Sequence, residues 1–198
     1  MVTHLIKTTL LAINKGKLMS VLASLPSGTF NIDPSHSRVG FSARHAMVTK
    51  VRGAFNEYTG SATIANGAAS INVEISVASV DTRSADRDGH LQSPDFFDVA
   101  NFPKITFAST SVKDAGSDKI AVDGNLTIKD VTKPITIEFE YTGTATDPFG
   151  NARFGFEGGA EINRKDFGLT WNAALETGGI LVSENIKLEF EISAIAAK

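Results

Sequence analysis

The chain has 198 residues, a formal net charge of −3 and no cysteine. This length suits one all-β domain, and the lack of cysteine excludes disulfides, thiolate metal sites and a cysteine nucleophile. The weak negative charge provides no long basic face for a phosphate backbone, so the sequence predicts no nucleic-acid partner. The aromatic residues are 13 Phe against two Tyr and one Trp. Because Phe has no polar group, this bias favours a deep apolar interior.

Residues 1–26 differ from the rest of the chain, and we expect them to form a loose tail outside the domain. The apolar run from Leu5 to Ile13 resembles a weak secretory signal, but a lysine interrupts it. It is also shorter than the about 20 apolar residues that span a bilayer. Met19 offers a second start, which would make residues 1–18 a start-site artefact. The domain itself is predicted to cover residues 27–198.

Most of the remaining chain alternates apolar and polar residues, which is typical of half-buried β-strands. The extended or alternating segments are residues 29–33, 38–45, 50–64, 71–77, 104–109, 120–128, 135–141, 153–157 and 186–192. Asn66-Gly67 predicts a hairpin turn, and Lys133-Pro134 and Asp147–Gly150 predict two further turns. In the segment 38–45, the alternation places His45 on the inward, apolar face.

So many amphipathic strands with so little helix can bury their apolar faces only against one another. The predicted fold class is all-β: an extended eight-stranded antiparallel β-barrel with one or two short helices. A closed barrel is favoured over a sandwich because several strands are long and successive turns are hairpin-like. About eight strands enclose an interior that is either filled by side chains or wide enough for one ligand.

The stretch from Asp81 to Asp98 interrupts the strand pattern with charges, a histidine and two adjacent aromatic residues. Residues 85–93 can form a short helix inside it. We expect this insert to cover one end of the barrel, with Phe96 and Phe97 facing inward and the charges facing solvent.

Charged residues of the insert raise the question of a catalytic loop. Asp86 and Asp88 are flanked by Arg83 and Arg87. This neighbourhood favours ionised carboxylates, whereas a general acid needs a raised pKa. The sequence therefore predicts salt bridges that pin the insert.

Other chemistry has weaker signals. His36, His45 and His90 lack the spacing of metal ligands, so no metal site is predicted. The chain has no GxSxG nucleophile elbow and no GxxxxGK[ST] phosphate loop. We assign no catalytic residue from these patterns.

An apolar ligand inside the barrel is the remaining possibility, with an ordinary packed core as its alternative. Aromatic residues occupy the apolar faces of separate strands, namely Phe41, Phe55, Phe107, Phe139, Phe156 and Phe190. Inward glycines and alanines, among them Gly53 and Gly124, are expected to leave room beside these rings. A buried hydrocarbon gains about 0.8 kcal/mol per CH₂, so a long chain could bind without any catalytic group.

Several motifs occur in one order along the chain. They are FNIDPSHSRVGFSARH at residues 30–45, VRGAF at 51–55, DTRSADRDGHLQSPDFFD at 81–98 with NFPKITF at 101–107, GNLTIKDVTKPI at 124–135 and NRKDFGLTW at 163–171. Together they resemble the YceI family, from about Thr29 to Ile195. The resemblance implies a lipocalin-like barrel whose elongated cavity holds a polyisoprenoid chain, such as an isoprenoid quinone or a polyprenyl lipid.

The prediction is therefore binding, storage or transport of a long-chain polyisoprenoid, with no cofactor other than that lipid and no enzymatic activity. The predicted ligand-binding residues are Phe41, His45, Phe55, His90, Phe96, Phe97, Phe107, Phe139, Phe156 and Trp171. One alternative is an enzyme or stress-response factor that uses His45 and His90 on an isoprenoid-like substrate, and another is a packed barrel acting through partners. Transient membrane contact and a homodimer stay open. A cytoplasmic location is expected, with a periplasmic or secreted one as the alternative.

Overall fold

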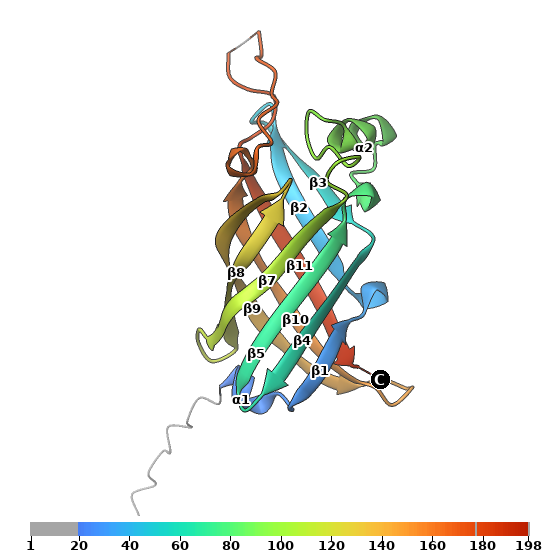
Figure 1. The fold of residues 1–198 in the computed structure, drawn as a ribbon, viewed down its shortest axis with the longest axis vertical. Helices are drawn as coiled ribbons and strands as arrows, with labels where there is room; N and C mark the ends of the chain where they lie inside the picture. The colour runs from blue at the N-terminus through green and yellow to red at the C-terminus, as the bar shows by residue number, and fades with distance from the viewer. Residues whose placement is uncertain (1–19, 177, 198) are drawn as a thin grey trace, which may run out of the picture.

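The computed structural model describes residues 20–176 and 178–197, and all of its strands belong to one curved antiparallel sheet (Figure 1). The helices are α1 (Val21–Ser24) and α2 (Ala85–Gln92), with short 3-10 turns η1 (Pro34–His36), η2 (Val77–Ser79) and η3 (Arg164–Phe167). The strands are β1 (Gly28–Ile32), β2 (Arg38–His45), β3 (Thr49–Phe55), β4 (Tyr58–Ala65), β5 (Ala68–Ser76), β6 (Val80–Asp81), β7 (Lys104–Asp114), β8 (Lys119–Ile128), β9 (Val131–Thr146), β10 (Ala152–Asn163) and β11 (Asn185–Ala196).

Eight strands close into an antiparallel barrel in the order β1-β4-β5-β7-β8-β9-β10-β11, because β11 pairs with β1 as well as with β10. The remaining strands, β2, β3 and β6, extend the sheet from β11. β1 and β2 pair with successive parts of β11. Ile32 of β1 is opposite Ala194, and Val39 of β2 is opposite Phe190. The predicted eight-stranded barrel is confirmed. The break between β1 and β2 agrees with the separate segments predicted at 29–33 and 38–45, whereas the single segment predicted at 50–64 is interrupted between β3 and β4.

Of the three predicted turns, two are confirmed and one is wrong. Asp147–Gly150 joins β9 to β10, and the Gly150 N–H donates to the Asp147 carbonyl at 2.9 Å. Asn66 and Gly67 join β4 to β5 with positive φ angles of 52° and 76°, as a tight hairpin requires. The turn predicted at Lys133-Pro134 lies instead at Lys129-Asp130, where φ is 50° and 61°. Pro134 sits within β9, on a stretch where β8 is the one strand paired with it. A missing N–H is tolerated on such a free edge.

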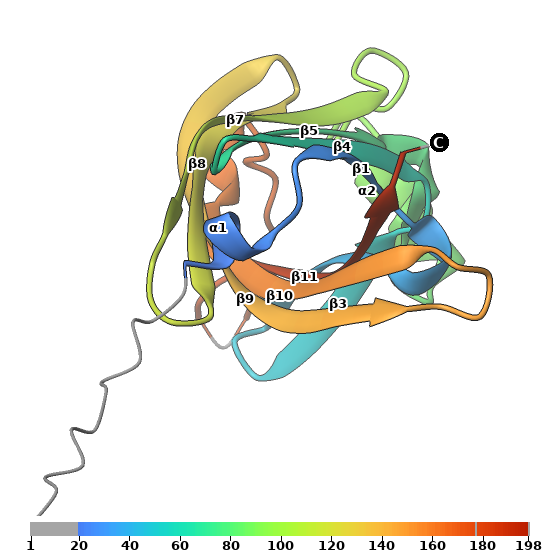
Figure 2. The ribbon, with the colours of Figure 1, turned by 90° about the horizontal axis from the view of Figure 1, so that it is seen from below.

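The N-terminal end of the described chain closes one end of the barrel. α1 buries Val21 and Leu22 against β7 and β8, and in Figure 2 it lies over the rim of the barrel. The Leu22 N–H donates to Asp114 Oδ1 at 3.3 Å, and the Ser20 hydroxyl bonds the same carboxylate. The prediction of a loose tail up to residue 26 is therefore wrong for residues 20–26. Its earlier part, with the signal and start-site hypotheses, lies outside the described residues.

The α2 insert covers the opposite end (Figure 1). α2 agrees within one residue with the helix predicted over 85–93. The predicted salt bridges are wrong, because neither Arg83 nor Arg87 forms an ion pair with any described residue. Instead, the buried Thr82 donates its N–H and hydroxyl to Asp88 Oδ1 at 2.9 and 2.6 Å. Arg87 donates to the Thr82 hydroxyl and carbonyl, each at 2.7 Å.

No helix in residues 20–176 and 178–197 has the length and apolar character needed to cross a membrane.

Candidate functional site: an apolar cavity inside the barrel

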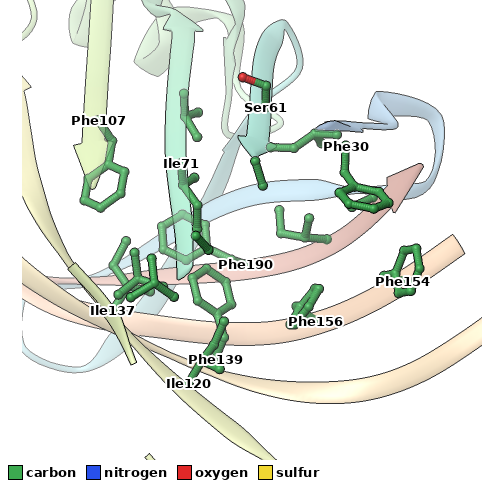
Figure 3. Close-up of a pocket in the computed structure, with 18 of the residues that line it drawn as sticks. Phe30, Ser61, Ile71, Phe107, Ile120, Ile137, Phe139, Phe154, Phe156 and Phe190 are labelled. Carbon is green, nitrogen blue, oxygen red and sulfur yellow. The ribbon is translucent and has the colours of Figure 1, made fainter. Parts of the chain in front are cut away.

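A cavity of about 160 Å³ lies inside the barrel, and its lining reaches the end that carries α1 (Figure 3). Its walls come from α1 and from every strand of the closed barrel. The lining residues are Leu22, Leu25, Phe30, Ile32, Val39, Ser61, Ala62, Ile64, Ala69, Ile71, Val73, Ile75, Phe107, Val112, Ile120, Val122, Leu126, Ile135, Ile137, Phe139, Phe154, Phe156, Leu188, Phe190, Ile192 and Ala194. All but Ser61 are hydrocarbon side chains, and the Ser61 hydroxyl points away from the phenyl rings in Figure 3.

Strand alternation and register build this lining. In an antiparallel pair, residues directly opposite each other share one face of the sheet. Ile120 of β8 is opposite Phe139 of β9, and Val122 is opposite Ile137. The backbone polar groups of these strands are engaged in the ladders, so the wall presents hydrocarbon to the interior.

The cavity lies within two hydrophobic clusters. The larger one extends from α1, through much of the cavity lining, toward α2 and η3, where Phe167 and Val77 are only 2% and 1% exposed. The smaller one, at the α1 end, consists of Phe30, Ile64 and Phe154. The rings of Phe30 and Phe154 meet edge to face with centroids 5.2 Å apart. The cavity lining thus reaches the α1 end, whereas the aromatic residues beside α2 lie outside it.

The room expected beside the inward glycines is already occupied. A Cβ atom added to Gly124 would lie 2.3 Å from a ring carbon of Phe107, and one added to Gly53 would lie 2.4 Å from the Phe41 ring. The expectation that these two glycines leave space for a ligand is therefore wrong. Because glycine has no side chain, the aromatic ring of the neighbouring strand fills the space beside each of them.

Three of the predicted ligand-binding residues line the cavity: Phe107, Phe139 and Phe156. Phe139 lies 5.9 Å from Phe190 and Phe156 lies 5.3 Å from Tyr141, measured between ring centroids. These two ring pairs lie on β9, β10 and β11. Their contact with a ligand stays a prediction.

Six other predicted residues form an aromatic group at the α2 end, outside the cavity lining. Phe55 lies 5.6 Å from Phe41 and 5.8 Å from Phe97. His90 packs edge to face between Phe96, at 5.0 Å, and Trp171, at 4.7 Å. The inward orientation of Phe96 is confirmed by its burial, but it meets packed core instead of the cavity.

The two histidines singled out by the sequence occupy different settings. His45 is exposed at the end of β2, where the strand has passed the barrel, so its predicted inward orientation is wrong. His90 Nε2 lies 3.0 Å from Asp95 Oδ2. No contact joins these histidines in the described part of the chain, and no group of three side chains there has the arrangement of a metal site.

A buried arginine holds the loop that carries Trp171. The Arg164 side chain donates to the carbonyls of Leu169, Val182 and Ser183, and burial lowers its pKa. A buried guanidinium bonded to three carbonyls organises the backbone, and Arg164 is not among the residues that line the cavity. Trp171 is consequently positioned against the α2 insert.

A charged network braces the α1 end. Arg153 of β10 donates to Asp147 Oδ2 at 2.9 Å and to Asp33 Oδ2 at 2.6 Å, which ties the β9–β10 turn to the start of η1. Hydrogen bonds from Asn151, from the Phe149 N–H and from Arg153 lower the pKa of Asp147 to about 2. Bonds from Ser35 and Arg153 also hold the pKa of Asp33 well below its usual range.

Sequence reasoning missed the residues that close the cavity at the α1 end. Leu22 and Leu25 were assigned to the tail, and Phe30 was not recognised as the partner of Phe154. The apolar spacing of Val21, Leu22 and Leu25 was a signal for a short amphipathic turn. Their role could be seen only once the barrel end beside them was known.

A second hollow lies on the outer face of β4, β5, β7 and β8. Polar side chains such as Asn72, Glu74 and Thr106 contribute to its walls. Its lining includes polar groups, whose contact with an apolar molecule would cost them their water. The interior cavity is therefore the better site for an apolar molecule.

The fold and the cavity define a lipocalin-like β-barrel with a hydrocarbon interior. The chain belongs to the YceI family, because the model of the YceI-like domain matches residues 30–194. A UPF0312 protein of Yersinia pestis (strain Pestoides F) is 39% identical over 193 residues, which cover 93% of this chain and all of that protein. A UPF0312 protein of Yersinia enterocolitica is 37% identical, covering 96% of this chain and 98% of its own length.

Solved structures share the barrel. The YCEI protein of Campylobacter jejuni aligns with a TM-score of 0.68 at 29% identity, covering 78% of this chain and 90% of that one. BcnA of Burkholderia cenocepacia gives 0.71 at 24% identity, covering 82% and 98%. A domain of Saccharophagus degradans described as polyisoprenoid-binding gives 0.67 at 17% identity, covering 85% and 98%. The two more distant structures establish the fold.

Proposed function

We propose that this protein binds a long-chain polyisoprenoid inside its barrel, as a means of storing or transporting it. The observation that supports it most directly is the cavity inside the barrel, whose lining is hydrocarbon except for Ser61. Membership of the YceI family and the barrel shared with a polyisoprenoid-binding domain support the choice of ligand class. An isoprenoid quinone or a polyprenyl lipid is the specific ligand we propose.

The cavity must enlarge before it can hold a long isoprenoid chain. An apolar cavity of about 150 Å³ holds one benzene molecule, and this one encloses about 160 Å³. A chain of several isoprene units therefore needs additional space, which the thin closure at the α1 end can supply by moving. Burial of about ten CH₂ groups would contribute roughly 8 kcal/mol before the cost of that movement.

The enzymatic alternative receives no support from the positions of its residues. His45 is exposed at a strand end, and His90 is held between Phe96 and Trp171. Neither histidine lines the cavity.

The test fills the cavity with a side chain of matching size. Ala69 lines the cavity, so Ala69→Phe places a ring of about the cavity's own volume inside it. Ala108→Phe is the matched control, because Ala108 is exposed on the outer face of β7. Purified protein would be incubated with an isoprenoid quinone in detergent and analysed by native mass spectrometry and organic extraction.

We expect one ligand per chain in the parent protein and in Ala69→Phe a loss of occupancy of about tenfold or more, since about 1.4 kcal/mol of lost contact already gives that factor. Ala108→Phe should bind as the parent does. A parent protein that stays empty with every isoprenoid offered, or equal occupancy in all three proteins, would overturn the proposal.

A further inference from the structure

We infer that the end of the barrel carrying α1 contacts a phospholipid bilayer, with Phe149 of the β9–β10 turn entering the membrane interface. The inference rests on the proposed function, because an isoprenoid must pass between a membrane and the cavity. It adds the partner surface and the end of the barrel at which that passage occurs.

The position of the cavity selects the end. Leu22 and Leu25 and the cluster of Phe30, Ile64 and Phe154 close the cavity on the α1 side. On the other side, the core continues without a break to Val77, Phe167 and the α2 insert. An apolar chain entering from the α2 end would have to displace the packed core, whereas the α1 end presents one short helix and an aromatic pair.

Phe149 is the most exposed large apolar side chain of the described residues, at 89%. It stands in the turn that joins β9 to β10, and in Figures 1 and 2 this turn extends sideways from the barrel wall at the α1 end, across the opening from α1. Phe154 and Phe156, on the strand that follows the turn, line the cavity itself. The exposed ring and the cavity wall therefore belong to one hairpin.

Hydrogen bonds hold the backbone of the turn that carries this ring. Asp147 Oδ1 accepts the N–H of Phe149 and the N–H of Asn151, both at 2.9 Å, while Arg153 donates to the other carboxylate oxygen. A turn whose backbone is already ordered loses little conformational entropy when its tip enters an interface. The charges beside the ring keep a net negative sign, since the single Arg153 guanidinium pairs with two carboxylates, Asp147 and Asp33. A neutral membrane surface fits this end better than a strongly anionic one.

The opposite end offers a matched comparison. The β2–β3 turn exposes Met47 at 59% and Val48 at 75%, the other two exposed large apolar side chains of the described residues. This turn lies beyond the packed half of the barrel. If any exposed apolar side chain in a turn could mediate membrane contact, both turns would contribute.

The experiment is flotation of the full chain with phosphatidylcholine vesicles. We expect Phe149→Ser to reduce the bound fraction about tenfold, which equals about 1.4 kcal/mol. The double variant Met47→Ser/Val48→Ser should float as the parent does. Binding should also change little with salt, because it depends on apolar contact and not on charge. Absence of flotation for the parent, equal losses in both variants, or loss only in the Met47/Val48 variant would overturn the inference.

A second readout separates this inference from the proposed function. Phe149→Ser should take up isoprenoid quinone from detergent to the same occupancy as the parent, but acquire it from vesicles about tenfold more slowly. Uptake from detergent by both proteins with equal rates from vesicles would overturn the membrane contact alone. No uptake from detergent by either protein would overturn the proposed function as well.

Discussion

At the scale of single residues, the interior of this barrel depends on glycines that face aromatic rings across the strands. Gly124 faces Phe107, and a Cβ on Gly158 would lie 2.6 Å from the Phe139 ring and 2.3 Å from the Glu138 carbonyl oxygen. Each glycine lets a ring of the neighbouring strand lie flat against the sheet. The rings thus help to form the cavity wall without filling the cavity.

Gly124→Ala should destabilise the protein by about 1 to 3 kcal/mol, the usual cost of overpacking a filled site. The new methyl group would lie 2.3 Å from the Phe107 ring and 2.7 Å from the Ala108 carbonyl oxygen. The measurement is the midpoint of urea unfolding. Gly89→Ala is the control, since nothing lies within 4 Å of its added Cβ in α2. It should raise stability by about 0.5 to 1 kcal/mol. An unchanged midpoint for Gly124→Ala would show that the ring can move aside.

Asp147 makes the α1 end sensitive to acid. Its pKa falls from 3.8 to about 2 on folding, so its stabilising contribution is fully present above the unfolded value and is lost as the pH falls through the folded one. We expect Asp147→Asn to lower stability at neutral pH and to flatten the loss of stability between about pH 4 and pH 2. Urea midpoints across this range measure both effects.

Asp130→Asn is the control for that series. Asp130 is an exposed turn residue with a positive φ of 61°, a conformation that Asn accepts well. Its pH profile should run parallel to that of the parent protein. If Asp147→Asn did the same, the Arg153 network would not be responsible for the acid sensitivity.

At the scale of elements, the two helices close opposite ends of the barrel in different ways. α2 is fixed by the Thr82 network and by aromatic packing against Trp171 and Phe55. α1 is only four residues long and is attached through Leu22 and the Asp114 carboxylate. The closure of the cavity therefore rests on the smaller and less firmly attached element.

Leu22→Ala should speed the release of bound isoprenoid by about tenfold or more. A buried Leu→Ala change destabilises the folded state by about 2 to 5 kcal/mol. Here the lost contacts are those that hold α1 in its closed position. The rate of transfer from loaded protein to excess vesicles measures it. Ala23→Ser alters the exposed side of the same helix and should leave the rate unchanged. Equal release from the parent and from Leu22→Ala would place the exit of the ligand elsewhere.

At the scale of the whole molecule, alternation in the sequence was enough to predict the closed barrel and the inward rings of Phe107, Phe139 and Phe156. It could not distinguish a filled interior from a hollow one, because that depends on which residue lies opposite which. In the sequence, Gly124 indicates free space inside the barrel. In the structure, the pairing of β7 with β8 places the Phe107 ring over it.

The remaining errors have the same origin. His45 follows the alternation of β2, but the strand extends past the barrel, so an inward direction no longer means burial. Phe96 and Trp171 were predicted to bind the ligand, but they lie outside the cavity lining and pack against each other. Leu22 was dismissed because the isolated segment before Pro26 is too short to reveal that a barrel end lies beside it.

The most direct measurement is a crystal structure of the protein loaded with an isoprenoid quinone. We predict density for the isoprenoid chain in the α1 half, in contact with Ile71, Phe139 and Phe156, with Phe55 and Phe97 still packed against each other. Density at the α2 end, or an empty cavity in protein shown to carry the quinone, would contradict the account.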